Sequence, residues 1–301
     1  MNIRNIAIIA HVDHGKTTLV NELLKTGGAF RDNEEVTDRV MDNNDIEKER
    51  GITILAKTTS VYYKDTKINI LDTPGHADFG GEVERIMNMV DGCLLLVDAF
   101  EGTMPQTRFV LKKALQSHIK PIVCINKVDR ANINIERTLD EVLELFIELG
   151  APDEFLEFPV VFTSALKGTS SLQANPSTQV PGMECVLDTI IKEIDAPKVE
   201  LDSPLQMQIS LLDYNDFVGR IGIGTIKKGT IHVNDNVTVS RLDGSLTNFR
   251  VMKLFGFQGL KRVEITSASA GEIVAVAGLA DINVGETICE PNKVDPLPLI
   301  K

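Results

Sequence analysis

A phosphate-binding motif lies near the start of the sequence. The segment AHVDHGKT, residues 10–17, follows a short apolar run and opens a helix-like pattern, although Ala10 replaces the usual first glycine. In this setting backbone N–H groups face phosphate oxygens, the lysine reaches the β and γ phosphates, and the following hydroxyl binds Mg²⁺. The residues expected to contact a nucleoside triphosphate here are Asp13, His14, Gly15, Lys16, Thr17 and Thr18, with Thr17 also a Mg²⁺ ligand.

A second motif predicts which base is bound. Asn126-Lys-Val-Asp129 follows a β-rich run. A carboxylate accepts two hydrogen bonds from guanine, at N1–H and at the exocyclic amine, whereas adenine offers no such pair of donors. Asp129 therefore favours GTP over ATP, with the Lys127 stem along the base and Asn126 holding the phosphate loop. The segment Ser164-Ala165-Leu166 follows the next strand. One of its backbone N–H groups is expected to reach the guanine carbonyl.

Two further segments respond to the γ-phosphate. Asp72-Thr-Pro-Gly-His76 follows an apolar strand-like run, so Asp72 can hold Mg²⁺ through its water and the Gly75 N–H can meet the γ-phosphate. Upstream, the Thr53 hydroxyl completes the Mg²⁺ shell in the triphosphate state. Either segment alone would be an ordinary turn, but their order with the other motifs along the chain makes coincidence negligible.

The pattern between these motifs predicts an α/β fold. Short β-rich runs alternate with helical patterns, which is typical of parallel strands with helices on both faces and ligands at the carboxyl ends of the strands. The expected strands are 5–10, 67–71, 93–98, 121–126 and 159–163. The expected helices are 16–25, 81–90, 106–116, 137–149 and 184–194, and residues 167–182 are expected to form a surface loop.

After residue 204 the pattern changes to short alternating strands with tight-turn residues, which predicts an antiparallel β-barrel. We expect a GTP-binding domain at 1–197, a linker at 198–204 and the barrel at 205–301. Between Arg220 and Arg262 the chain carries eight basic residues (220, 227, 228, 241, 250, 253, 261, 262) and two acidic ones (235, 243). That region is equally compatible with an RNA-binding face and with a solvated surface of mixed charge.

Composition limits the class of protein. The chain has 301 residues, 43% hydrophobic and 25% charged, with a formal net charge of -12. These values are typical of a globular protein and exclude a disordered, collagen-like or coiled-coil chain. The four cysteines lack metal-binding spacing, which suits buried thiols in the cytoplasm. No apolar stretch is long enough to span a membrane.

The motifs together resemble those of translational GTPases, and more closely the BipA (TypA) family of ribosome-associated GTPases. The resemblance is carried by four stretches: residues 39–50, residues 72–85 (DTPGHADFGGEVER), residues 105–109 (PQTRF) and residues 213–219 (DYNDFVG). It covers essentially the whole chain. Family members continue beyond residue 301, so the resemblance implies that further C-terminal domains are absent here.

The resemblance also implies a mechanism and partners. It places His76 as the residue that orients the attacking water, Val12 and Ile52 as an apolar gate, and Asp13 beside a monovalent cation. Core packing is an equally weighted interpretation of Val12 and Ile52. It further implies a cytoplasmic monomer that acts on the ribosome (rRNA, ribosomal proteins and tRNA), serves large-subunit assembly and stress or cold adaptation, and binds GTP, GDP and ppGpp.

Two alternatives remain, and one site is rejected. A nucleotide-sensing module with incidental hydrolysis fits the same motifs, whereas a small-molecule kinase is disfavoured because no acceptor pocket is recognisable. No arginine is an evident catalytic finger, so turnover without the ribosome is expected to be slow. His11 and His14 share the phosphate loop, but their spacing fits no closed metal site, and we interpret them as neighbours of the phosphates.

Overall fold

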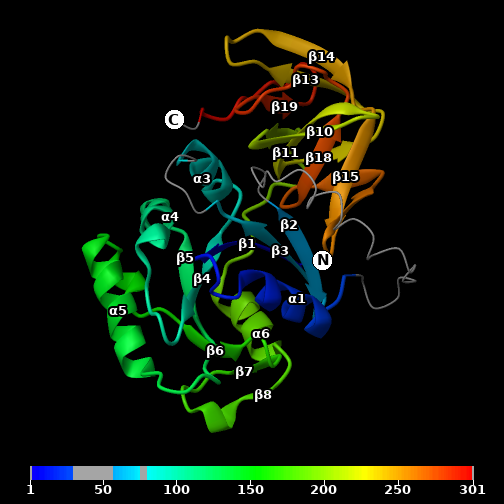
Figure 1. Cartoon of the computed structure of the whole chain (residues 1–301). Helices are drawn as coiled ribbons and strands as arrows, with labels where there is room; N and C mark the ends of the chain where they lie inside the picture. Colours follow the sequence, from blue (N-terminus) through cyan, green and yellow to red (C-terminus); the bar gives the residue numbers. More distant parts are fainter. Residues whose placement is uncertain (1, 30–56, 75–79, 300–301) are drawn as a thin grey trace.

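The computed structural model describes residues 2–29, 57–74 and 80–299. These residues form an α/β domain followed by an antiparallel β domain, as Figure 1 shows. The predicted fold class is confirmed.

The first domain is built on an eight-stranded sheet in the order β2-β3-β1-β4-β5-β6-β7-β8. The five strands from β3 to β6 in this order are parallel, while β2, β7 and β8 pair antiparallel at the two edges. The strands are β1 (Asn2–Ala10), β2 (Thr58–Tyr63), β3 (Thr66–Asp72), β4 (Gly92–Asp98), β5 (Lys120–Asn126), β6 (Val160–Ser164), β7 (Thr169–Ser171) and β8 (Val180–Pro181).

Helices cover both faces of this sheet. One layer holds α1 (Lys16–Thr26) and α6 (Glu184–Glu193), and the other holds α3 (Gly80–Met87), α4 (Pro105–Gln116) and α5 (Ile135–Glu148). The side chains of β1 alternate between the layers: Ile6 and Ile8 pack with α1 and α6, whereas Ala7 and Ile9 pack with the other three helices. Strands buried on both faces must be apolar throughout, which explains their hydrophobic runs.

Local sequence defines the helix ends. The Asn134 side chain accepts a hydrogen bond from the Arg137 amide at 3.0 Å and caps the start of α5. Val142, Leu145 and Phe146 are buried at helical spacing, so one face of α5 packs on the sheet. Gly150, with φ of 73°, follows the end of the helix, where its left-handed conformation is tolerated.

The expectation of a surface loop at residues 167–182 is wrong. This segment contains β7, a short 3₁₀ helix (Pro176–Thr178) and β8, and β7 extends the sheet from β6. Strands of only two or three residues are too short to show a periodicity, so no strand is predicted there. Strand β2 was also not anticipated; it pairs antiparallel with β3 at the other edge of the sheet.

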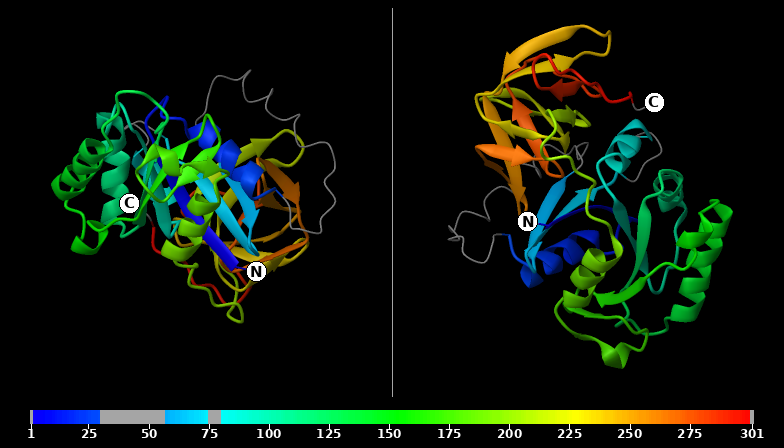
Figure 2. Two further views of the ribbon diagram at one scale, coloured as in Figure 1. Left: turned by 90° about the horizontal axis from the view of Figure 1, so that it is seen from below. Right: turned by 180° about the vertical axis from the view of Figure 1, so that it is seen from behind.

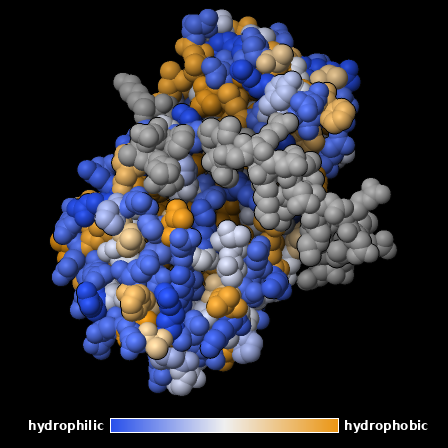
Figure 3. Space-filling model, in the orientation of Figure 1, coloured by the Kyte–Doolittle hydropathy of each residue, from blue (hydrophilic) through white to orange (hydrophobic). Residues whose placement is uncertain are grey.

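The second domain is an antiparallel sheet curved around its own apolar core, which includes Met207, Ile226, Val239 and Ile288. Hydrophilic residues dominate the surface in Figure 3, with a group of hydrophobic residues on the second domain. The strands are β9 (Gln206–Gln208), β10 (Leu211–Asn215), β11 (Gly219–Lys228), β12 (Thr230–His232), β13 (Asn236–Ser240), β14 (Leu246–Arg250), β15 (Lys253–Gln258), β16 (Lys261–Glu264), β17 (Ser267–Ser269), β18 (Ile273–Ala277) and β19 (Thr287–Cys289). No helix among the described residues is long and apolar enough to cross a membrane.

The two domains are joined by buried polar contacts. Ser60 of β2 and Gly259 exchange two backbone hydrogen bonds of 2.9 Å. The Asn5 side chain donates to the Gly271 carbonyl at 3.0 Å. The apolar core around α3 and α4 also continues into Ile221 and Ile223 of the second domain. The second domain therefore packs beside β2 and α3, as both views of Figure 2 agree.

Candidate functional site

The polar ends of five strands meet at one edge of the first sheet. The parallel strands β1, β3, β4, β5 and β6 end in this region, and the phosphate loop and α1 follow β1 directly. Carboxyl ends of parallel strands lie at the same edge, where α/β proteins bind ligands. The structure thus brings together the following residues from distant parts of the sequence: Lys16, Asp72, Asp98, Asn126 and Ser164.

The loop before α1 has the backbone of a phosphate cradle. Gly15 caps the helix in a left-handed conformation with φ of 93°, and Asp13 has φ of 70°. A Cβ atom on Gly15 would lie 2.6 Å from the Asn126 side-chain nitrogen, so a larger residue could not fit beside it. Leu19 and Leu23 anchor α1 in the core, and its free N-terminal amides are held at the strand ends.

Asn126 is the centre of the base side of the site. Its Nδ2 donates to the His14 carbonyl at 2.9 Å, and its Oδ1 accepts from the Thr163 hydroxyl at 2.9 Å and from the Ala165 amide at 3.0 Å. The side chain is buried. One amide therefore ties β5 to β6 and to the phosphate loop, as the sequence predicted for the loop.

Lys127 and Asp129 extend this side toward solvent. The Lys127 ammonium donates to the Asp13 carbonyl at 2.7 Å and lies 3.0 Å from Oδ2 of Asp98. Asp129 accepts from the Ser164 hydroxyl at 2.8 Å. The Asp129 carboxylate is thus held against the residue that ends β6.

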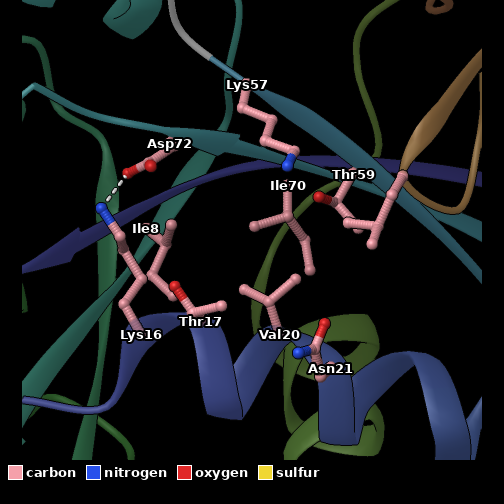
Figure 4. A pocket seen from close by; sticks show the side chains of 10 residues that line it. Ile8, Lys16, Thr17, Val20, Asn21, Lys57, Thr59, Ile70 and Asp72 are labelled. Carbon is pink, nitrogen blue, oxygen red and sulfur yellow. Dashed lines mark hydrogen bonds and ion pairs between the residues drawn. The ribbon is translucent and has the colours of Figure 1, made fainter. Parts of the chain in front are cut away.

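Lys16 and Asp72 define the phosphate side. Their charged groups lie 2.5 Å apart, and each side chain is about one-third exposed, at 31% and 33%. Figure 4 shows the pair beside a cavity of about 110 Å³. The cavity runs between α1 and strands β2 and β3, and is lined by Ile8, Lys16, Thr17, Val20, Asn21, Lys57, Thr59, Ile70, Asp72 and Leu260.

The hydroxyl of Thr17 and the carboxylate of Asp72 are oxygen donors that a hard cation could use. Both line this cavity, and Mg²⁺ prefers oxygen ligands, so the donor chemistry fits the ion. The two groups come from the start of α1 and the end of β3. Thr59 and Asn21 also bring side-chain oxygen atoms to the cavity lining.

The remaining predicted residues are placed as follows. Thr18 is exposed on α1, and the Leu166 side chain is 83% exposed. Val12 is 67% exposed, which removes the core-packing interpretation for this residue. Four predicted positions lie outside the described residues, namely Ile52, Thr53, Gly75 and His76.

Asp98 is a site residue that the sequence analysis missed. Its carboxylate is fully buried and accepts hydrogen bonds from the amides of Phe100 and Glu101 at 2.8 and 3.2 Å. Burial favours the neutral acid, but these hydrogen bonds and the Lys127 ammonium outweigh it and lower the pKa of Asp98. Its position in the sequence could have identified it, because Asp98 ends a predicted strand, as Asn126 does, and Asp72 directly follows one.

The strand order, the cradle at Gly15 and the polar edge define a P-loop nucleotide-binding domain of the α/β class. Comparison with known families is more specific. The family described as the elongation factor Tu GTP binding domain matches residues 1–196, and elongation factor Tu domain 2 matches residues 219–289. The chain belongs to the family of the elongation factor Tu GTP binding domain.

Similar curated proteins carry one description, large ribosomal subunit assembly factor BipA. The protein from Bacillus subtilis (strain 168) is 62% identical over 300 residues, which are 100% of this chain and 49% of that protein. Those from Salmonella typhimurium and Synechocystis are 53% and 52% identical over 99% of this chain, and 49% and 50% of their own lengths. The chain therefore spans about half the length of these relatives, and the resemblance to the BipA family is confirmed.

Proposed function

We propose that this chain is the GTP-binding part of a molecular switch that acts on the ribosome and hydrolyses GTP to GDP and phosphate. The observation that carries the proposal is the convergence of Lys16 and Asp72 with Asn126 and Asp129 at one sheet edge. The name of the relatives, large ribosomal subunit assembly factor, supports a role on the ribosome during assembly of its large subunit.

The proposed binding mode assigns a task to each side of the site. The base lies against the Lys127 stem, Asp129 accepts from guanine, and the segment Ser164–Leu166 borders the guanine carbonyl. The phosphates lie on Lys16 and on the loop amides of residues 13–18. Mg²⁺, when bound by Thr17, Asp72 and Thr53, neutralises charge on the phosphates. Gly75 and Thr53 report the γ-phosphate.

Hydrolysis in this proposal depends on positioning. In-line attack on the γ-phosphoryl group needs an oriented water and charge neutralisation more than a strong base. His76 orients the water, Val12 and Ile52 form the gate that delays it, and Asp13 lies beside a monovalent cation. Turnover without ribosomes is then slow, on the order of 10⁻⁴ to 10⁻² per second.

The finer partners are part of the same proposal. The protein acts as a cytoplasmic monomer, contacts rRNA, ribosomal proteins and tRNA, and binds ppGpp as well as GTP and GDP. Residues 1–197 form the GTP-binding domain, 198–204 the linker and 205–301 the barrel domain. The free thiols of Cys93, Cys124 and Cys289 are buried, which suits a reducing compartment.

Calorimetric titration tests base selection. GDP and a non-hydrolysable GTP analogue are expected to bind the chain, and ATP is not. Asp129→Asn replaces an acceptor by a donor, so GDP affinity should fall about 100-fold or more, because a hydrogen bond to a charged group contributes about 1.5–3 kcal/mol. Xanthosine diphosphate, which has a carbonyl in place of the exocyclic amine, should bind the variant better than GDP does. Equal affinity of the wild-type chain for ATP would refute the assignment.

Ribosome-stimulated turnover separates the enzyme from the sensing module. In the full-length protein, His76→Ala should keep its GTP affinity and lose the stimulation by ribosomes. If turnover is unchanged, hydrolysis is incidental and the nucleotide only marks a state.

A further inference from the structure

Three side chains with metal-binding atoms meet beside the phosphate loop, and of these residues only His14 is also assigned a nucleotide contact, through its backbone amide. His11, His14 and Glu101 each offer one ligand atom, and these atoms all lie within 4.8 Å of one another. Nε2 of His14 lies 3.0 Å from Oε2 of Glu101, and the two imidazole rings have centroids 4.8 Å apart. From the sequence, the histidine pair is rejected as a metal site because its spacing fits no closed site, and Glu101, 87 residues from His14, is not recognisable there as a third ligand.

Backbone hydrogen bonds fix both the loop that carries the two histidines and the turn that carries Glu101. The backbone of His14 is fixed by the hydrogen bond from Asn126 to its carbonyl, and its amide donates to the His11 carbonyl at 3.2 Å. The turn that carries Glu101 is fixed by Asp98, which accepts the Glu101 amide. The backbone that carries the three side chains is therefore held on both sides of the cluster, which supports a metal site.

The two imidazoles are not saturated by partners within the described residues. His14 is only 2% exposed, and the Nδ1 atoms of both His11 and His14 are buried with no hydrogen-bond partner there. Nε2 of His14 faces the Glu101 carboxylate and is the His14 atom available to a metal ion in this cluster. His11 places a second imidazole beside it.

We propose that His11, His14 and Glu101 form a binding site for Zn²⁺. Two imidazoles and one carboxylate are a donor set that Zn²⁺ uses with a fourth, open position, whereas Mg²⁺ prefers oxygen ligands in octahedral geometry. Tetrahedral Zn²⁺ bonds of about 2.0–2.2 Å place ligand atoms about 3.4 Å apart. His14 and Glu101, at 3.0 Å, are near this spacing, whereas the three ligand atoms together lie within 4.8 Å, so the Glu101 side chain, which is 46% exposed, would adjust to close the site.

The ion would join two segments that the nucleotide also depends on. It would connect the phosphate loop to the turn after β4, where Asp98 contacts the Lys127 ammonium. The Zn²⁺ site is chemically distinct from the Mg²⁺ donors Thr17 and Asp72, so both ions can be bound at once. This inference does not depend on GTP hydrolysis.

Zinc titration tests the proposal. Zn²⁺ is added to the chain in competition with a fluorescent chelator, with GDP and Mg²⁺ in excess so that the oxygen site is occupied, and again without nucleotide. One tightly bound Zn²⁺ per chain is expected. Glu101→Gln and His11→Ala should each weaken binding by about 100-fold or more, since even outer-shell changes cost 10–100-fold.

His232→Ala is the matched control. His232 also has a carboxylate partner, Asp235 at 3.3 Å, but no second histidine, so its removal should leave Zn²⁺ affinity unchanged. Circular dichroism melting checks that each variant is folded. Co²⁺ added in place of Zn²⁺ should give visible absorption bands of nitrogen ligation that are lost in His11→Ala.

The outcomes are decisive in both directions. Stoichiometric binding that both Glu101→Gln and His11→Ala weaken supports the site. The proposal is overturned if no Zn²⁺ binds under either nucleotide condition, or if His11→Ala binds as tightly as the wild type. In the latter case His14 and Glu101 form only a hydrogen-bonded pair.

Discussion

The base side and the phosphate side of the site are built differently. On the base side, buried Asn126 makes three hydrogen bonds of 2.9–3.0 Å, one to the phosphate loop and two to the end of β6 and the residue after it. On the phosphate side, Lys16 and Asp72 form one ion pair, each about one-third exposed, beside a cavity of about 110 Å³. One region is locked by buried polar contacts, and the other is held by a contact that solvent weakens.

This difference suits a switch. A base-binding corner with its hydrogen bonds already formed can hold GTP and GDP equally, because the base does not change during hydrolysis. In the proposed switch the phosphate side rearranges when Mg²⁺ and the γ-phosphate bind, and an ion pair with one-third of each side chain exposed costs little free energy to break. The phosphate side also borders the second domain, since Leu260 lines the cavity and β2 bonds to Gly259.

The largest expected effect on stability comes from Asn126→Ala. The change leaves the His14 carbonyl, the Thr163 hydroxyl and the Ala165 amide without this partner, so the free energy of unfolding should fall by about 3 kcal/mol. Urea unfolding of the nucleotide-free chain measures it. Thr163→Val removes one of the three bonds and is expected to cost about 1 kcal/mol. Equal costs for the two variants would show that Asn126 is not the centre of the base side.

A smaller, pH-dependent effect is expected at the opposite end of β4. Burial raises the pKa of Asp91 to about 6 from 3.8, although the ammonium of Lys227 in the second domain opposes the shift. Because the folded-state pKa is the higher one, the stabilisation from protonated Asp91 is complete below about pH 4 and is lost as the pH rises through 6.

Asp91→Asn should therefore stabilise the chain by about 1–2 kcal/mol at pH 7.5 after allowance for partial exposure, and the gain should vanish near pH 4. Unfolding in urea at several pH values measures the difference from wild type. GDP affinity should not change, because Asp91 lies far from the strand ends that bind the nucleotide. A gain that does not vary with pH would contradict the assignment to Asp91.

The smallest effect on stability is expected for Lys16→Met. Exposed ion pairs contribute about 0–1 kcal/mol, so unfolding of the nucleotide-free chain should change by less than about 1 kcal/mol. GDP affinity, in contrast, should fall at least about tenfold, because hydrogen bonds from a charged group to phosphate are lost. Lys25→Met breaks an exposed pair with Glu22 on the same helix and should change neither quantity. A large loss of stability in Lys16→Met would erase the distinction between the two sides.

The fold was largely predictable, with failures at particular places. The five parallel strands and five helices are marked by apolar periodicity, because burial on both faces of the sheet demands it. The edge strands β2, β7 and β8 were missed: β7 and β8 have only three and two residues, too few for a periodic pattern, and β2 (Thr58–Tyr63) has no clear alternation of apolar and polar residues. The ligand-binding roles of Thr53, Gly75 and His76 stay predictions, since these residues lie outside the described part of the chain.

The sequence by itself determined the class of ligand and the α/β plan, because the phosphate loop, Asp129 and the apolar runs each carry their chemistry locally. Only the tertiary structure showed that Asn126 is tied to both the phosphate loop and the end of β6, that Lys16 meets Asp72, and that Glu101 lies against His14. Contacts between residues dozens of positions apart depend on how parallel strands are ordered. Spacing along the chain does not record that order.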